Sequence, residues 1–187
     1  MPVIFVAGTD TGVGKTVVTD LLARQLASEG YRVAKQKWVE TGVTRSRAVF
    51  SFRLAASPHL AARREGRAID IKEIKRSLEE LSAINDFVIV EGTGGLLVPL
   101  DGKKLFIDIV NELNIPVILV SANRLGTINH TLLSLEAMKS RNIKVLGVIF
   151  NNISRKENKF ILRDNPVIVK RFGKIPVAVL PFMKELK

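Results

Sequence analysis

A glycine-rich run that ends in lysine and threonine, GTDTGVGKT at residues 8–16, has the composition of a phosphate-binding loop. In such loops backbone N–H groups surround a polyphosphate, the lysine reaches the β- and γ-phosphates, and the hydroxyl ligates Mg²⁺. The usual spacing is Gly, four residues, then Gly-Lys-Ser/Thr. Here the first glycine, Gly8, lies one residue too early. The run is therefore either an accidental match or a longer variant of the loop.

As a phosphate loop, this run predicts an ATP site in which Lys15 is a catalytic cation and Thr16 is a magnesium ligand. The loop residues expected to contact the nucleotide are Gly12, Val13, Gly14, Lys15, Thr16 and Val17. An ordinary glycine-rich turn with a surface lysine is the alternative. Gly-Lys-Thr between a buried strand and an amphipathic helix is a specific combination, so we prefer the phosphate loop. We expect Lys15 at the surface of the empty site, where its removal leaves the fold intact.

A second glycine-rich run, FVIVEGTGG at residues 87–95, places an acidic residue at the end of an apolar strand. Open α/β sheets bind ligands at the carboxyl ends of their strands, so we expect Glu91 to ligate Mg²⁺. Glycines beyond it let a ligand approach the backbone closely. The residues there that are expected to contact ATP are Gly92, Thr93 and Gly94. A buried strand that ends in an acid also occurs in sheets without a metal site.

A third run, KQKWVETG at residues 35–42, places lysine at the end of another expected strand. A lysine at that edge of the sheet would stabilise a second anion beside the γ-phosphate. Read in isolation, it is equally well explained as an ordinary surface lysine.

Short apolar runs rich in β-branched residues alternate with helical patterns along the chain, and they must position these three runs. The expected strands are Val3–Ala7, Arg32–Gln36, Phe87–Glu91, Val117–Ser121, Val145–Phe150 and Val177–Leu180. The expected helices are Thr16–Glu29, a second one marked by Ile71 to Leu81, Phe106–Leu113 and Asn129–Arg141. Several strands are apolar throughout, which is typical of parallel sheets covered on both faces. The pattern predicts an α/β fold with a doubly wound, mostly parallel sheet and helices on both faces, in a single domain of residues 1–187. Only Val43–Ala56 shows no clear periodicity.

The chain of 187 residues carries a formal net charge of +11 and no cysteine. Its basic residues are scattered, and one Trp and one Tyr are all it offers for base stacking beyond phenylalanine. We therefore expect a basic surface that attracts anionic substrates, and no nucleic-acid partner. The absence of cysteine excludes disulfides and thiolate metal sites. No apolar run reaches the roughly 18 residues that span a bilayer, and no signal-peptide pattern is present, so we expect a cytoplasmic protein without a membrane partner.

Taken together, the motifs resemble those of the dethiobiotin synthetases, which close the ureido ring in biotin biosynthesis. The resemblance rests on six runs in the family's order: GTDTGVGKT at 8–16, KWVETG at 37–42, SPHLAA at 57–62, VEGTGGLLVPL at 90–100, LGTINHT at 125–131 and GVIFNN at 147–152. These runs span nearly the whole chain, and the first followed by VEGTGG is a specific combination. The family's phosphate loop is the longer variant, which explains the early Gly8.

The resemblance implies a P-loop NTPase-like fold, with ATP, Mg²⁺, CO₂ or bicarbonate and 7,8-diaminopelargonate as reactants. It implies that Lys15 and Lys37 flank a carbamate and the γ-phosphate, and that the ring closes through a carbamic-phosphoric anhydride. The implied substrate-binding residues are Thr11, Lys37, Thr41, Gly126, Thr127, Ile128 and Asn129. The last four would receive a carboxylate of substrate bound mainly to the neighbouring subunit, so a homodimer is implied. Around the adenine, the implied contacts are Asn151, Asn152, Leu180, Pro181 and Phe182.

Two departures from the family's pattern stand out. Family members usually carry a further metal-binding aspartate after the strand that bears Lys37, and none occurs here between Thr41 and Asp70. Gly12 stands where many members have an acidic residue. An inactive paralogue is therefore one alternative. A regulatory or partitioning ATPase of the same P-loop branch is another, although the residues before Gly12 lack the additional lysine typical of that class.

Two histidines also invite catalytic interpretations. We interpret both as structural, with His59 holding a loop and His130 packed or capping near the start of its helix.

Overall fold

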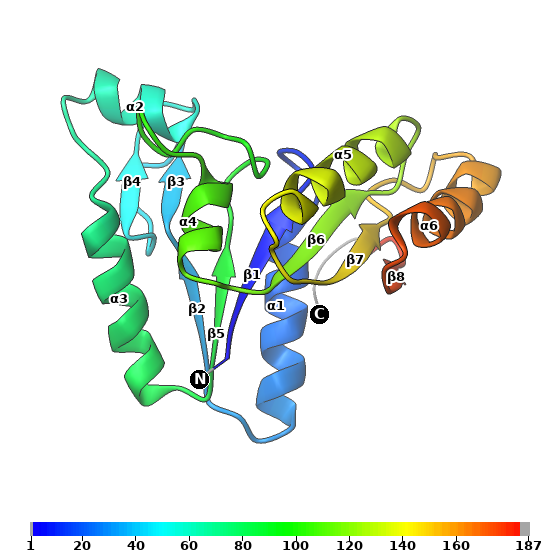
Figure 1. Ribbon diagram of the computed structural model, residues 1–187, viewed down its shortest axis with the longest axis horizontal. Helices are drawn as coiled ribbons and strands as arrows, with labels where there is room; N and C mark the ends of the chain where they lie inside the picture. Colours follow the sequence, from blue (N-terminus) through cyan, green and yellow to red (C-terminus); the bar gives the residue numbers. More distant parts are fainter. Residues whose placement is uncertain (1, 184–187) are drawn as a thin grey trace.

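The computed structural model describes residues 2–183, which form a six-stranded sheet with helices on both faces (Figure 1). The strands of this sheet are β1 (Val3–Gly8), β2 (Val33–Lys37), β5 (Phe87–Glu91), β6 (Val117–Ala122), β7 (Val145–Asn151) and β8 (Val177–Leu180). The helices are α1 (Lys15–Ser28), α2 (Pro58–Arg64), α3 (Ile71–Ile84), α4 (Phe106–Glu112), α5 (Thr127–Lys139) and α6 (Lys159–Gly173). Two short strands, β3 (Val39–Thr41) and β4 (Phe50–Phe52), pair in a separate small sheet.

The strand order in the main sheet is β2-β5-β1-β6-β7-β8, and every neighbouring pair is parallel. From β1 the chain first winds outward to β2 and later returns to fill β6, β7 and β8 on the other side. A crevice forms at the carboxyl ends of the strands where the winding direction reverses, and ligands of open α/β sheets bind there. The predicted fold class, a doubly wound parallel α/β sheet, is confirmed.

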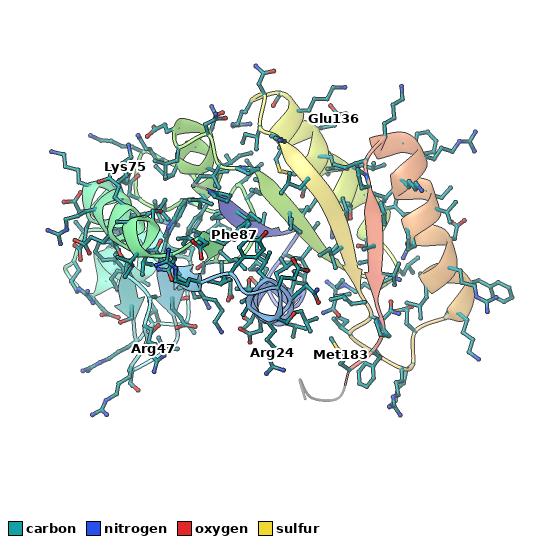
Figure 2. All side chains as sticks on the ribbon, turned by 90° about the horizontal axis from the view of Figure 1, so that it is seen from below. Arg24, Arg47, Lys75, Phe87, Glu136 and Met183 are labelled. Atoms are coloured by element: carbon teal, nitrogen blue, oxygen red, sulfur yellow. The ribbon has the colours of Figure 1, made fainter. Side chains whose placement is uncertain are left out.

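Side chains that alternate along the central strands divide the core into two layers. Val6 and Ile89 pack with Val18 of α1 on one face, whereas Phe5 and Val90 face the core built with α3, α4, α5 and α6. Figure 2 shows the sheet with α1, which carries Arg24, on one side and α5, which carries Glu136, on the other. Strands covered on both faces need apolar residues throughout, as the sequence pattern indicated.

The six expected strands of the main sheet and the four expected helices are all present. Four elements were not expected: α2, α6, β3 and β4. Helix α2 is one short stretch that starts at Pro58, and α6 contains Pro166, which weakens a helical pattern in the sequence. Within residues 2–183, no helix is both long enough and apolar enough to cross a membrane.

Trp38 links the main sheet to the small sheet. It is fully buried, with its ring 5.1 Å from that of Phe5 and stacked 6.4 Å from that of Phe106. This residue directly follows β2 and directly precedes β3, so its burial fixes where the chain turns from one sheet into the other. The side chains on either side of it, Lys37 and Glu40, are thereby held near the same crevice.

Candidate active site

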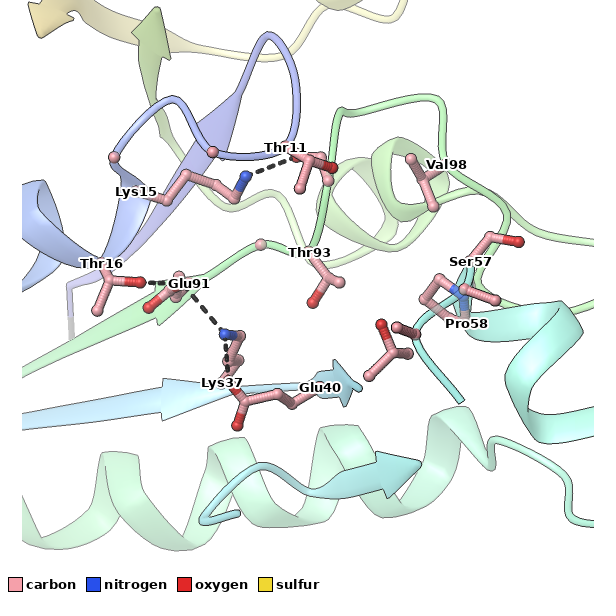
Figure 3. A pocket seen from close by; sticks show the side chains of 17 residues that line it. Thr11, Lys15, Thr16, Lys37, Glu40, Ser57, Pro58, Glu91, Thr93 and Val98 are labelled. Carbon is pink, nitrogen blue, oxygen red and sulfur yellow. Dashed lines mark hydrogen bonds and ion pairs between the residues drawn. The ribbon is translucent and has the colours of Figure 1, made fainter. Parts of the chain in front are cut away.

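A pocket of about 650 Å³ lies at the carboxyl ends of β1, β2 and β5 (Figure 3). It is lined by the phosphate loop, by the glycine-rich segment after β5, and by β3 with the segment that leads into α2. The lining residues are Thr11, Gly12, Gly14, Lys15, Thr16, Lys37, Glu40, Thr41, Ala55, Ala56, Ser57, Pro58, Glu91, Gly92, Thr93, Gly94 and Val98. The three chemistry-bearing runs of the sequence therefore meet in one cavity.

The phosphate loop takes a conformation that requires glycine at its turn into α1. Gly14 is the residue before the helix and has φ of 96°, in the left-handed region that L side chains rarely adopt. A Cβ atom there would lie 2.1 Å from Asn151 Nδ2, which itself donates a hydrogen bond of 3.1 Å to the carbonyl of Val13. The end of β7 thus supports the loop directly, and the space beside Gly14 has no room for a side chain.

Lys15 is buried, with 8% of its surface exposed, so the expectation of a surface lysine is wrong. Its Nζ donates hydrogen bonds to the carbonyls of Asp10, at 3.0 Å, and Gly94, at 2.9 Å. The physical reason is that the loop and the segment after β5 both close around the ammonium group. Burial lowers the pKa of Lys15 to about 8, with Glu91 opposing the shift and Lys37 adding to it. The lysine thus joins the two glycine-rich segments.

A chain of polar contacts crosses the pocket from α1 to β3, as Figure 3 shows. Thr16 Oγ1 donates a hydrogen bond of 2.8 Å to Glu91 Oε1. The same carboxylate oxygen lies 3.3 Å from Lys37 Nζ, which donates a hydrogen bond of 2.7 Å to Glu40 Oε1. Burial alone would lower the pKa of Lys37, but the hydrogen bond to Glu40 and the negative charges of both glutamates raise it above its ordinary value. Lys37 is therefore held as a cation between two carboxylates.

The Thr16 hydroxyl and the Glu91 carboxylate form a donor set that fits Mg²⁺, because this ion prefers oxygen ligands and usually takes few of them from protein. Glu91 is buried at the end of β5, where the ladder with β1 and β2 fixes its backbone. In the part of the chain that the structure describes, no group of three or more His, Cys, Asp or Glu side chains could hold a metal by itself. Asp10 does not join this set, since its side chain accepts from Thr11 N and lies 3.7 Å from Arg124.

Glu40 is the charged pocket residue that the sequence interpretation missed. It lies three residues after Lys37 in β3, and its other oxygen, Oε2, accepts a hydrogen bond from Ser46 Oγ. Burial would raise the pKa of Glu40, but the hydrogen bonds from Lys37 and Ser46 lower it below the ordinary value. The signal in the sequence was an acid three residues after a lysine. This spacing indicates an ion pair only when the chain is known to turn at Trp38.

The predicted adenine contacts lie outside the cavity, at the ends of β7 and β8. Asn151 is buried against the phosphate loop, and Asn152 Oδ1 accepts a hydrogen bond of 2.9 Å from Asn123. The ring of Phe182 lies 5.1 Å from the guanidinium of Arg155. The other predicted nucleotide contacts outside the cavity are Val13, Val17, Leu180 and Pro181.

The predicted carboxylate-binding segment, Gly126–Asn129, does not line the cavity either. It forms the start of α5, where Gly126 has φ of 87° and Thr127 is buried. A buried set of hydroxyl groups connects this start to the phosphate loop: Ser121 Oγ lies within hydrogen-bond distance of Thr9, Thr127 and Thr131. Within one chain, the first turn of α5 and the cavity therefore both adjoin the phosphate loop, but the first turn of α5 contributes no residue to the cavity.

The structure contradicts the interpretation of His130, whereas that of His59 stays a prediction. His130 is exposed in the first turn of α5, so the expectation of a packed or capping side chain is wrong. His59 Nδ1 is buried without a hydrogen-bond partner in the described residues. Neither residue lines the cavity.

Comparison with known proteins finds relatives along nearly the whole chain. A family model described as an AAA domain matches residues 3–187. The chain is 42% identical to the ATP-dependent dethiobiotin synthetase BioD of Chlorobaculum tepidum, over 95% of this chain and 86% of that protein. It is 39% identical to the ATP-dependent dethiobiotin synthetase BioD of Lysinibacillus sphaericus, over 97% of this chain and 88% of that protein. The alignment with the first covers 206 positions, so that relative has residues which this chain of 187 lacks.

Among solved structures, the MinD cell division protein of Aquifex aeolicus resembles the chain with a TM-score of 0.61. The match covers 98% of this chain and 84% of that one at 17% identity. An identity this low shows a shared P-loop fold alone, and it does not favour a partitioning or regulatory function.

Proposed function

The chain belongs to the family of ATP-dependent dethiobiotin synthetases, and from this we propose that its cavity is where diaminopelargonate, CO₂ and ATP react to form the ureido ring. The enzyme is a ligase that forms carbon–nitrogen bonds at the expense of ATP. One observation carries the assignment of the site: Lys15, Lys37 and Glu91 come from three separate elements and converge on one cavity. Such convergence at the carboxyl ends of parallel strands is the arrangement that nucleotide chemistry needs.

The phosphate side of the cavity is formed by the loop and by the end of β5. Backbone N–H groups of the loop would surround the phosphates, and Lys15 would exchange its two carbonyl partners for the β- and γ-phosphates. Thr16 and Glu91 would hold Mg²⁺ together with phosphate oxygens and waters. The ion would supply positive charge beside the transferred phosphoryl group. The hydrogen bond between these two side chains supports this pairing.

The substrate side of the cavity is formed by Lys37 and Thr41, with Thr11 of the phosphate loop. One amine of diaminopelargonate adds CO₂ and loses a proton, which gives a carbamate. A carbamate oxygen attacks the γ-phosphorus and ADP leaves. The second amine then attacks the carbamoyl carbon, phosphate leaves with the carbamate oxygen, and loss of a proton completes the ring. Lys15 and Lys37 would align the reactants and neutralise their negative charge, on which phosphoryl transfer depends.

The adenine would lie at the ends of β7 and β8, next to the phosphate loop. Asn151 would read the base, and its position against Val13 supports this because the loop continues directly into the phosphate site. The other residues proposed to contact the nucleotide outside the cavity are Val13, Val17, Asn152, Leu180, Pro181 and Phe182.

We propose a homodimer in which Gly126–Asn129 receives the carboxylate of substrate bound in the partner's cavity. Two observations support this arrangement. The segment does not line its own cavity, and apolar side chains beside it are exposed: Leu125 by 78%, Leu133 by 61% and Leu97 by 53%. Leu97 and Leu133 line the same surface groove, and contiguous exposed apolar surface is typical of an interaction site. We place the enzyme in the cytoplasm, with neither nucleic acid nor membrane as a partner.

Product formation tests the proposed reaction. The protein is incubated with ATP, Mg²⁺, diaminopelargonate and bicarbonate labelled in its carbon, and the organic product is isolated by chromatography. We expect label in dethiobiotin and an equal amount of ADP. ATP consumption without labelled dethiobiotin would contradict the assignment and favour a nucleotide switch.

A further inference from the structure

Glu40 lies inside the cavity and has no part in the reaction as proposed so far. Its Oε1 accepts a hydrogen bond of 2.7 Å from Lys37 Nζ, which is shorter than the 3.3 Å between that nitrogen and Glu91. In Figure 3 the lysine side chain lies between the two glutamates. Glu40 is therefore the nearer of the two anions that determine where the ammonium group of Lys37 stands.

The carboxylate of Glu40 is itself fixed from its other side. Ser46 Oγ donates to Glu40 Oε2, and the same Oγ accepts a hydrogen bond of 3.0 Å from Ala48 N. The backbone is fixed by the ladder of β3 with β4, in which Glu40 is opposite Ser51. The short segment between β3 and β4, which lacks the family's aspartate, thus folds back to hold a different carboxylate in the site.

These contacts matter most when Glu91 has another partner. With Mg²⁺ on Thr16 and Glu91, the Glu91 charge would be directed to the metal, and Glu40 would be the protein carboxylate left in contact with Lys37. We propose that Glu40 is a positioning residue, which holds the Lys37 ammonium group at the carbamate side of the cavity during ring closure. This inference rests on the proposed function, because it needs Lys37 to contact the reacting groups.

A direct metal contact by Glu40 is the competing explanation, and the geometry disfavours it. Both carboxylate oxygens already have a donor, Lys37 on one and Ser46 on the other. The hydrogen bond of Thr16, the other proposed metal ligand, goes to Glu91. The contacts of Glu40 thus point to the lysine.

The test compares Glu40→Gln with the parent in steady-state ring closure at saturating ATP and Mg²⁺. The substitution keeps the size of the side chain and removes its charge. We expect kcat to fall on the order of tenfold, since a misplaced reacting group costs rate. The Kd of ATP should change less than about twofold. Glu112→Gln is the matched control, because Glu112 contacts two lysines, Lys75 and Lys104, outside the cavity and should leave kcat unchanged.

A second variant and a double variant test whether the effect of Glu40 on kcat acts through Lys37. Ser46→Ala leaves the charge but frees one oxygen, and it should lower kcat in the same direction by about twofold to threefold. In a Lys37→Ala background, Glu40→Gln should cause no further loss, because its effect acts through Lys37. Because Ser46→Ala leaves Glu40 in place, its result would remain informative if Glu40→Gln folded poorly.

Three results would overturn the role of Glu40. They are an unchanged kcat in both single variants, a full additional loss in the Lys37→Ala background, or recovery of Glu40→Gln at raised Mg²⁺, which would indicate a metal ligand. A parent protein that forms no dethiobiotin would instead contradict the proposed function and, with it, the role of Glu40.

Discussion

Thr16 Oγ1 donates a hydrogen bond of 2.8 Å to Glu91 Oε1, across 75 positions of the chain. This bond joins the end of the phosphate loop to the end of β5, the two motifs that define the phosphate side of the cavity. Both groups offer oxygen, and they come from the first turn of α1 and from the last residue of β5. Because this hydrogen bond pairs the two proposed magnesium ligands, a substitution of Glu91 alone tests the site.

Glu91→Gln should raise the Mg²⁺ concentration needed for half-maximal activity while leaving the fold intact. The substitution removes one negative ligand, and the described residues supply no metal cluster that would replace it. We expect the Mg²⁺ titration of activity to shift by on the order of tenfold or more. Superimposable titration curves for parent and variant would mean that Glu91 is not a ligand.

Lys15→Ala should abolish ring closure and weaken ATP binding. The lysine is the loop's cation, and loss of a group that stabilises transition-state charge costs on the order of 100-fold to 1,000-fold in rate. The melting temperature should change by only a few degrees, because the two lost hydrogen bonds are offset by relief from burying an ammonium group. Calorimetry with ATP and a thermal melt check both parts. Ring closure at a rate near that of the parent would refute the phosphate-loop assignment.

ATP affinity should decline as the pH rises above about 8. In the free protein the pKa of Lys15 is lowered to about 8, chiefly by burial, so the side chain is protonated below that pH and progressively neutral above it. Phosphates bind the ammonium form, and binding above this pH therefore takes up a proton. The loss of affinity approaches tenfold per pH unit. Isothermal titration in buffers with different ionisation enthalpies measures this uptake.

Lys15→Arg is the control for this pH dependence, because a guanidinium stays protonated throughout the range. Its ATP affinity, whatever its value at pH 7, should stay constant between pH 7 and pH 9. A parent protein with an equally flat profile would show that the lysine does not titrate in this range.

The proposed homodimer predicts that Leu125→Glu yields monomers that bind ATP but close the ring slowly. Leu125 is 78% exposed just before α5, so a charge there leaves the isolated chain folded and disfavours apolar contact with a partner. Sedimentation at micromolar concentration measures the assembly state. Ile84→Glu is the matched control, since Ile84 is 65% exposed at the other end of the sheet, in the last position of α3. Full activity in a monomeric parent would refute the shared site.

The sequence predicted the main sheet well because its central strands, β1, β5 and β6, are buried on both faces. Such strands are apolar throughout and are bounded by turn residues, so Phe87–Glu91 was predicted with the bounds that the structure has. Helix α6 was missed for the opposite reason. It presents Phe160, Val167 and Phe172 to solvent and carries Pro166 within it, so its pattern does not separate a buried face clearly from an exposed one.

Site residues could be predicted from the sequence where the local backbone determines their position. Those whose position depends on contacts between distant parts of the chain could not. Gly14 and Lys15 are placed by a strand-to-helix turn that the local sequence specifies. The burial of Lys15 depends on Gly94, far along the chain, and no local pattern shows that contact. Glu40 was missed because its role depends on the buried turn at Trp38 and on the return of Ser46.

The fate of the bicarbonate oxygen tests the central claim most directly. With bicarbonate fully labelled with ¹⁸O in unlabelled water, the protein is mixed with ATP, Mg²⁺ and diaminopelargonate and stopped within seconds, before the label exchanges with solvent. If a carbamate oxygen attacks the γ-phosphorus and leaves with phosphate, mass spectrometry will find one ¹⁸O atom in each phosphate released with a molecule of dethiobiotin. Phosphate whose fourth oxygen comes from water would contradict the claim, because it would mean that ATP is hydrolysed without passing through the carbamate.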